Sequence, residues 1–272
     1  MKLKNILLGA MGALMTLAAA SCSNIDEDER LIYVKPAEVG RAVLIEDFTG
    51  QKCVNCPKGT EAISAIVETY GEDNVIAVGI HSGPLGFKGT KKLLGLATDT
   101  GNEYYNKWDK DQKLGQPWAL FNRSTTPSSD YNTWATFIKD LIAKKAALSI
   151  TVDNTYDAAT RTLTTGIDAM GTNGNTNGKL QVWLVEDGIV AMQMMPDGSS
   201  NKEYVHNHVF RAAVNGTWGE DVAVKEGETT KKQYSYTLPE EWNAENVSVV
   251  AFVYNDNGVE QVAKKGVVRV DK

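Results

Sequence analysis

Apolar residues in the first part of the chain follow two alternating patterns. Short unbroken apolar runs at 41–45, 74–80 and 118–121 are typical of buried strands. Residues 59–70 and 134–148 instead place apolar side chains at helical spacing. Strands that alternate with helices predict an α/β unit with a mainly parallel sheet.

From residue 148 onward, strand-like segments occur without helices. Turn-forming Gly, Asn and Asp residues separate them, as at 173–178 and 256–258. The segments expected to be strands are 149–152, 162–167, 180–185, 222–224, 234–238, 247–254 and 267–270. This pattern predicts an antiparallel β-sandwich of immunoglobulin-like type. We therefore expect two domains, at 36–147 and 148–272.

The N-terminal residues 1–21 have the parts of a secretory signal peptide. Two lysines precede an apolar run at 6–20, and small residues follow it. The run is shorter than the roughly 20 apolar residues that a transmembrane helix needs. The segment from Ala19 to Cys22 resembles a lipobox, in which the cysteine is acylated, although Ala19 stands where a Leu, Val or Ile is usual. Simple secretion with cleavage near Ser21 is the alternative.

The segment after Cys22 is polar and acidic, so residues 22–35 are expected to be a solvated tether. Its acidic residues resemble signals that send lipoproteins to the outer face of the outer membrane; a plain spacer is the alternative. Removal of the signal takes two lysines from a formal net charge of −6 and leaves −8. That charge, with no basic patch, argues against a nucleic-acid partner.

Cys53 and Cys56 lie between the strand expected at 43–48 and the helix that follows it. A helix start favours the thiolate of Cys53, and a second cysteine one turn away can resolve a mixed disulfide. Zinc sites share this spacing, but they need four ligands and the chain has no second cysteine pair. A permanent disulfide closing so small a loop gains only roughly 2 kcal/mol, which favours exchange chemistry.

Asp47, Cys53, Cys56 and the segment Gly115-Gln116-Pro117 resemble landmarks of the thioredoxin fold in the right order. The resemblance implies that Asp47 is buried and moves protons for the resolving cysteine. It also implies that Pro117 follows a cis peptide bond, faces the dithiol and binds extended peptide backbone. A capping role for Asp47 and a turn role for Pro117 are the alternatives.

The active-site segment also departs from the thioredoxin pattern. Lys52 replaces the usual Trp, the inner dipeptide is Val-Asn, and Pro57 follows the second cysteine instead of preceding it. Because the dipeptide tunes a potential that ranges from about −270 to −120 mV across this fold, the direction of electron flow stays open.

The three histidines give weaker indications. His81 ends an expected strand, at the edge where α/β sheets place their sites, so it either faces the dithiol or lies in a loop. His206 and His208 are expected to share one face of a strand. They could ligate a metal, but no acidic or Cys partner completes a site, so a surface or packing role is favoured. Met192, Met194 and Met195 are expected to fill irregular gaps.

The segments Glu46–Pro57 and His206–Arg211 together resemble the Bacteroidetes-type family named for a 28-kDa outer membrane protein. Its members are lipoproteins that pair a thioredoxin-like domain with a β-sandwich, and the resemblance covers nearly the whole mature chain. It implies an outer membrane lipoprotein of a Gram-negative envelope, facing the periplasm or the surface. It assigns no activity.

Two functions are compatible with these features. In the first, the protein exchanges thiols and disulfides with protein partners: Cys53 attacks, Cys56 resolves, Asp47 assists proton transfer and Pro117 positions the substrate backbone. In the second, it is a surface binding or adhesion lipoprotein whose CxxC is a structural disulfide. In either case the lipid on Cys22 provides contact with the membrane. No cofactor and no metal are assigned.

Overall fold

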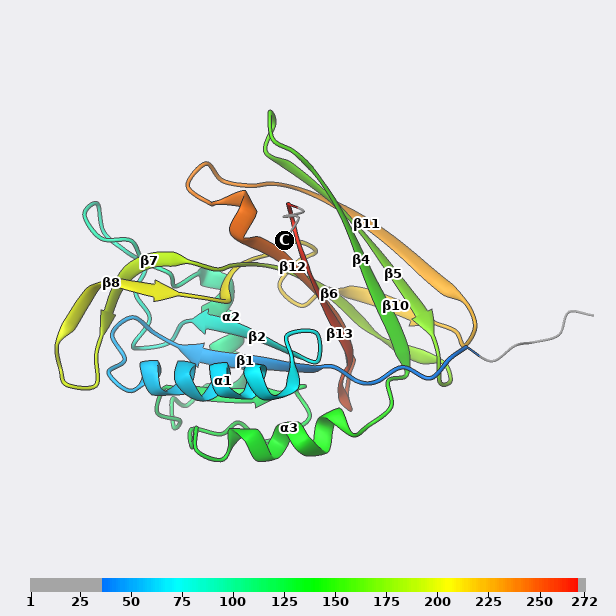
Figure 1. Ribbon diagram of the computed structural model, residues 1–272, viewed down its shortest axis with the longest axis horizontal. Coiled ribbons are helices and arrows are strands. Elements are labelled where there is room, and N and C mark those ends of the chain that lie inside the picture. Colours follow the sequence, from blue (N-terminus) through cyan, green and yellow to red (C-terminus); the bar gives the residue numbers. More distant parts are fainter. Residues whose placement is uncertain (1–35, 269–272) are drawn as a thin grey trace, which may run out of the picture. The chain divides into compact units, whose positions relative to one another are not determined.

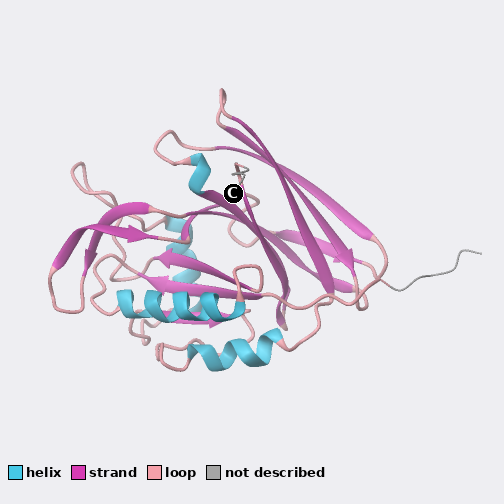
Figure 2. Cartoon of the chain, in the orientation of Figure 1, coloured by secondary structure: helices cyan, strands magenta, loops and turns pink. Residues whose placement is uncertain are grey.

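The structure is a computed structural model that describes residues 36–268. The predicted signal peptide, Cys22 with its predicted lipid and the predicted tether therefore lie outside the described residues. Within the described part, the chain is rich in strands that form several antiparallel sheets, as predicted for the second half (Figure 1, Figure 2). No described helix is long and apolar enough to cross a membrane.

The centre of the fold is a parallel pair of strands joined by a helix. β1 (Val43–Thr49) and β2 (Val75–His81) pair in parallel, and α1 (Cys56–Tyr70) connects them. β3 (Trp118–Phe121) pairs with the other edge of β1 but runs antiparallel to it, so the expected mainly parallel sheet is wrong at this strand. Residues of β1 and β3 are all buried, which explains why the sequence shows unbroken apolar runs.

The helices cover both faces of these strands. α1 and α3 (Trp134–Ile142) pack on one face, where their apolar side chains meet those of the three strands (Figure 1). α3 ends six residues before the predicted end at 148, where β4 begins. α2 (Asp99–Trp108) lies on the other face through Tyr104 and Tyr105. Its Tyr104, Tyr105 and Trp108 stand at helical spacing, but the segment is polar overall and was not predicted as a helix.

Among the described residues, eight strands form one sheet in the order β13-β12-β6-β9-β2-β1-β3, with β10 also paired to β6. The additional strands are β6 (Thr176–Glu186), β9 (Val209–Ala213), β10 (Glu220–Val224), β12 (Val247–Asn255) and β13 (Gly258–Gly266). β9 joins the two halves, because Gly79 N donates to His208 O at 2.8 Å beside the Gly79–Val209 pair. The boundary expected at 147 stays a prediction.

A second sheet of the described chain consists of β11 (Thr229–Thr237), β5 (Thr162–Gly171) and β4 (Leu148–Asp157), in that order. Side chains of β5 alternate between buried and partly exposed, as expected for a sheet with one covered face. Its buried side packs against β6, β10 and β12 over a shared apolar core. This arrangement is a sandwich of two sheets, completed by the short 3-10 helix η2 (Ala244–Asn246) before β12.

A hairpin of β7 (Ile189–Met194) and β8 (Ser200–His206) projects from the second half toward the start of α1 (Figure 1). Neither strand is predicted from apolar patterning in the sequence; only the end of β8 at His206 is expected to be extended. β8 ends at His206, and His208 follows it at a φ of 56°, before β9 begins. The expectation that His206 and His208 share one face of a strand is therefore wrong.

A buried ion pair links β1 to the residues after β3. The guanidinium of Arg123 donates to both carboxylate oxygens of Glu46, at 2.9 and 2.8 Å, and both side chains are almost completely buried. The same guanidinium lies 4.5 Å from the ring centre of Tyr254 on β12. Because a buried charge without its partner is costly, this pair fixes where β12 packs on the central strands.

Candidate functional site

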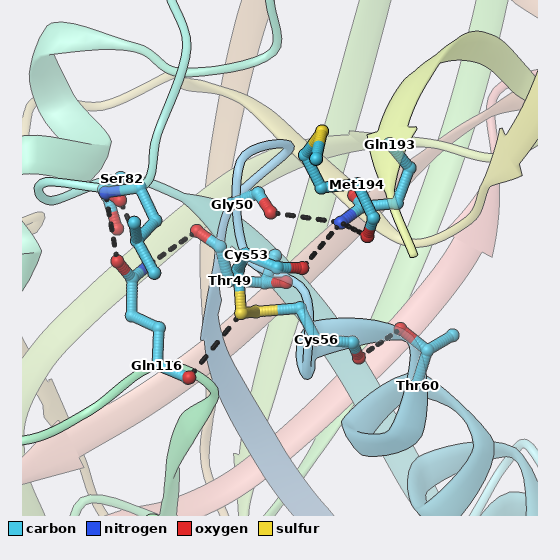
Figure 3. The surroundings of a disulfide bond; sticks show 10 residues. Thr49, Gly50, Cys53, Cys56, Thr60, Ser82, Gln116, Gln193 and Met194 are labelled. Atoms are coloured by element: carbon cyan, nitrogen blue, oxygen red, sulfur yellow. Dashed lines mark hydrogen bonds between the residues drawn. A yellow bond between two sulfur atoms is a disulfide. The ribbon is translucent and has the colours of Figure 1, made fainter. Parts of the chain in front are cut away.

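A disulfide joins Cys53 and Cys56 at the start of α1, where β1 has just ended (Figure 3). Cys53 N donates to Gly50 O at 3.0 Å, which folds the short loop before the helix. Pro57 occupies the first turn of α1, where a missing N–H leaves no helical bond unmade. Its place after the second cysteine therefore suits the helix start.

The disulfide is covered in this form of the protein. Cys53 is 1% and Cys56 is 2% exposed, so neither residue is open to solvent. The loop around them is clear in Figure 3, with Gln116 on one side and Gln193 and Met194 on the other. These two sides come from distant parts of the sequence.

The first side is the segment before β3. The Gln116–Pro117 peptide bond is cis. The amide of Gln116 donates to Thr49 O at 2.8 Å and to Ser82 O at 3.0 Å, so it ties the segment to the ends of β1 and β2. The carbonyl oxygen of Gln116 lies 3.4 Å from Cys53 Sγ.

Pro117 itself is buried against α1. A Cβ placed on Gly59 would lie 2.9 Å from Pro117 Cγ, so the absence of a side chain on Gly59 lets helix and proline approach. Pro117 thus lies beside the disulfide loop, but it is not an open surface in this form of the protein.

The second side is the β7–β8 hairpin, which is held to the disulfide loop by a clamp of two glutamines. Gln193 Nε2 donates to Cys53 O at 2.8 Å and to Gly50 O at 3.3 Å. Met194 N donates to Gln51 O at 2.9 Å, and the Gln51 side chain donates to Met192 O at 3.0 Å. No motif in the sequence points to these glutamines, because they meet only after the hairpin folds over the loop.

A small polar cavity of about 30 Å³ lies behind Cys56. Its lining includes Asp47 from β1, His81 from β2, and Tyr204 and His206 from β8. Asp47 Oδ1, His81 Nδ1 and His206 Nε2 are buried and have no hydrogen-bond partner among the described residues. The rings of His81 and His206 have centres 5.1 Å apart.

Burial shifts the protonation of all three groups. It raises the pKa of Asp47 to about 7, because the charged carboxylate loses its hydration. Burial also lowers the pKa of His206 to about 4. The pKa of His81 is held well below its usual value, first by burial and then by His206 and Arg211. Near neutral pH both imidazoles are therefore uncharged.

The structure brings together Cys53, Cys56, Asp47 and His81, with Pro117 beside the loop. It adds His206, which the sequence analysis assigned to surface or packing. His208 is absent from the cavity lining; its Nδ1 lies 3.0 Å from a carboxylate oxygen of Asp187. Within residues 36–268, no group of three or more His, Cys, Asp or Glu side chains has an arrangement that could hold a metal ion.

Comparison with known proteins identifies the family. A sequence profile of the family described as outer membrane protein Omp28 matches residues 101–271. HBP35 of Porphyromonas gingivalis has a similar fold, with a TM-score of 0.62 over 84% of this chain and 76% of that one, at 14% sequence identity. A domain of the outer membrane lipoprotein Omp28 from Porphyromonas gingivalis is 28% identical, covering 44% of this chain and 86% of its own, with a TM-score of 0.33. No curated protein sequence matches the chain.

The profile match places the chain among outer membrane proteins, which confirms the predicted localisation. The chain belongs to the outer membrane protein Omp28 family. The family gives the location and not the chemistry, so the function has to be argued from the site.

Proposed function

We propose that residues 36–147 form a thioredoxin-like unit that exchanges thiols and disulfides with protein partners through Cys53 and Cys56, beside an immunoglobulin-like sandwich. The observation that carries the proposal is the arrangement around the disulfide. The cysteines lie at a helix start between parallel strands, with a buried carboxyl group and a cis-proline segment next to them. Each of these has a chemical use in exchange.

In the reduced protein, the unpaired N–H groups and macrodipole at the start of α1 stabilise a thiolate on Cys53. This thiolate attacks one sulfur of a partner's disulfide, and the other partner sulfur leaves as a thiolate and takes up a proton. Cys56 then loses its proton and attacks Cys53 Sγ, which expels the second partner thiolate. The partner disulfide is reduced, and the protein dithiol is oxidised to the bond seen here. The reverse sequence oxidises a partner dithiol.

The burial of both cysteines sets a condition on this chemistry. A partner sulfur can reach Cys53 only if the end of the β7–β8 hairpin around Gln193 and Met194 moves away from the loop, because these two residues are hydrogen-bonded to the loop backbone. Residues 196–203 beyond Met194 are exposed, and such segments open at low cost, while the base of the hairpin, where Ile189 pairs with His206, stays in place. Exchange therefore follows this opening.

A second candidate function, binding of an envelope partner, rests on a separate groove of about 1170 Å³. It is lined by Trp108, Trp218 and Tyr254 together with Arg123. Trp108 Nε1 and Arg123 Nη1 are buried N–H donors with no partner among the described residues. A ligand with acceptor oxygens and an apolar face fits these groups. Cross-linking in intact cells tests it: Trp218→Ala should lose a captured partner that Cys53→Ser keeps.

The exchange function is tested by the reduction potential and turnover of the full mature chain. The potential of the Cys53–Cys56 couple is measured in thiol–disulfide buffers, and insulin reduction is followed with Cys53→Ser as the control. We expect a potential between about −270 and −120 mV and turnover that disappears in the control. A potential below about −300 mV without turnover would show that the bond is structural.

A further inference from the structure

The cavity behind Cys56 is lined by buried polar atoms that the fold leaves without hydrogen-bond partners. Asp47 Oδ1, His81 Nδ1 and His206 Nε2 are all buried, and all lack a protein partner in the described chain. Buried polar atoms are rarely left unpaired, since each then loses its hydration without a hydrogen bond in return. Three such atoms in the lining of one cavity therefore point to something that bridges them.

Water fits this cavity. Its volume of about 30 Å³ exceeds the roughly 10–15 Å³ that a single water needs, and the three unpaired atoms supply the two to four partners that hold one. Asn207, which is exposed, also belongs to the lining, so the cavity reaches toward the surface. The bridge can therefore exchange protons with solvent.

We propose that His81 and His206, through water in this cavity, carry protons between Asp47 and solvent each time Cys56 is deprotonated or reprotonated. The inference rests on the proposed exchange function and extends it to two residues of the chain. They are positioning and relay residues, because they act on Cys56 through Asp47.

The proton follows a balanced path. Cys56 Sγ–H gives its proton to the Asp47 carboxylate, and the resulting thiolate forms the bond to Cys53 while the partner sulfur leaves with the electron pair. Asp47 passes the proton to water and then to the imidazoles. A neutral imidazole has one N–H and one lone pair, so it can accept a proton on one nitrogen and release one from the other.

The protonation states around the cavity require each imidazole to accept one proton and release another in a single concerted step, without becoming charged. Asp47 has a pKa of about 7, so near neutral pH it can both accept and release a proton. The imidazoles are neutral there, and Arg211 on β9 further disfavours a charge on His81. The remaining titratable groups facing the cavity are Tyr204 on β8, which interacts with Thr60 and Glu61 of α1, and Cys56 itself.

The test follows the resolving step in the full mature chain. Reduced protein is mixed with an aromatic disulfide probe (dithionitrobenzoate) in a stopped-flow instrument. The first thiolate release reports attack by Cys53, and the second reports attack by Cys56. The variants are His81→Gln and His206→Gln, which keep hydrogen-bonding groups but cannot carry protons. His208→Gln is the matched control, because His208 lies outside the cavity lining.

We expect the second thiolate release to slow by about tenfold or more at pH 7 in both cavity variants. The first release in these variants, and both releases in the control variant, should keep the wild-type rate. The deficit should vanish near pH 10, where Cys56 ionises directly to solvent. In the wild type, the second release should slow in D2O at pH 7 and not at pH 10; this measurement needs no variant to fold.

Three results overturn the relay. The first is a wild-type rate in both cavity variants, the second is an equal deficit at every pH, and the third is no solvent isotope effect at pH 7. In each of these three cases, the proposed exchange function still stands if the wild-type protein releases two thiolates in sequence. A wild-type protein with no second release shows that Cys56 does not resolve, which overturns both the exchange function and the relay.

Discussion

The glutamine clamp over the disulfide gives a quantitative prediction. If the end of the β7–β8 hairpin around Gln193 must open before any thiol reaches Cys53, weakening the clamp must speed reduction of the disulfide. Gln193→Ala removes the two side-chain hydrogen bonds from the hairpin to Cys53 O and Gly50 O. The backbone bond from Met194 N to Gln51 O is left in place.

The size of the effect follows from these bonds. Each hydrogen bond contributes a net stability of about 0.5–1.5 kcal/mol, so the loss of two costs the closed form about 1–3 kcal/mol. A difference of that size raises the population of the open form by about 5–150-fold. The reduction rate rises by the same factor when opening is rapid and unfavourable, because the rate is then proportional to that population.

The assay is reduction of the full mature chain by excess dithiothreitol, quenched with an alkylating reagent and read by mass spectrometry. Gln233→Ala is the matched control, since Gln233 is an exposed glutamine on β11 of the second sheet. We expect acceleration in Gln193→Ala and an unchanged rate in the control. Equal rates in wild type and Gln193→Ala would refute the reasoning, because the hairpin would then not limit access.

Three further predictions concern stability, measured by urea unfolding. Asp47→Asn should stabilise the protein above pH 7 by up to about 4 kcal/mol relative to wild type. The reason is that the native pKa of the Asp47 carboxyl group, about 7, lies above its unfolded value of 3.8. Wild type therefore loses this stability between about pH 4 and 7. Glu46→Gln should cost about 3–5 kcal/mol, since it leaves the buried charge of Arg123 without its partner. Gly59→Ala should cost about 1–3 kcal/mol by pushing against the proline ring behind it, whereas Gly115→Ala, with open space around it, should cost less.

Each of these predictions has a result that contradicts it. For Asp47→Asn, a gain that is equal at pH 4 and pH 8 would mean that the carboxyl group is not titrating abnormally. The comparison for Glu46→Gln is Lys231→Ala, which breaks an exposed ion pair with Asp168 worth under about 1 kcal/mol. If Glu46→Gln loses no more stability than Lys231→Ala, the buried charge of Arg123 is not costly. Equal losses for the two glycine variants would show that the helix and proline can separate freely.

The pH dependence has a second component of opposite sign. The native pKa of His206, about 4, lies below the unfolded value of 6.5, so between these pH values the unfolded chain binds more protons. Burial of this histidine therefore makes stability rise with pH over the range in which Asp47 makes it fall. Removing Asp47 should expose the rising component alone.

The central strands were predictable because their side chains are covered on both faces. Within these strands, residues 43–45 and 75–80 are unbroken apolar runs, and α1 between them has one apolar face at helical spacing. The CxxC motif could also be recognised from the sequence, because both cysteines and the helix start lie within a few residues of each other. Only the bounds shifted: α1 begins at Cys56, before the predicted start at residue 59, because Cys56 and Pro57 belong to its first turn.

The hairpin and the histidine pair could not be predicted in this way. β8 is mostly exposed and polar, so it has no apolar alternation to identify it. His206 reaches His81 because β9, which follows the hairpin, docks beside β2 at Gly79. That contact depends on how strands far apart in the sequence order themselves in one sheet. The clamp residues Gln51 and Gln193 were missed because glutamine side chains also occur on protein surfaces, so a glutamine in the sequence does not indicate a buried contact.

The most direct test of the exchange function is to trap its intermediate. Cys56→Ser in the full mature chain cannot resolve a mixed disulfide, so reaction with a peptide disulfide should stop at a bond between Cys53 and the peptide. Mass spectrometry of the alkylated product reads that bond, with Cys53→Ser as the control. We predict a stable mixed disulfide on Cys53 in the first variant and none in the second. Absence of the adduct in Cys56→Ser, under conditions where a free peptide thiol reacts, would contradict the assignment of Cys53 as the attacking cysteine.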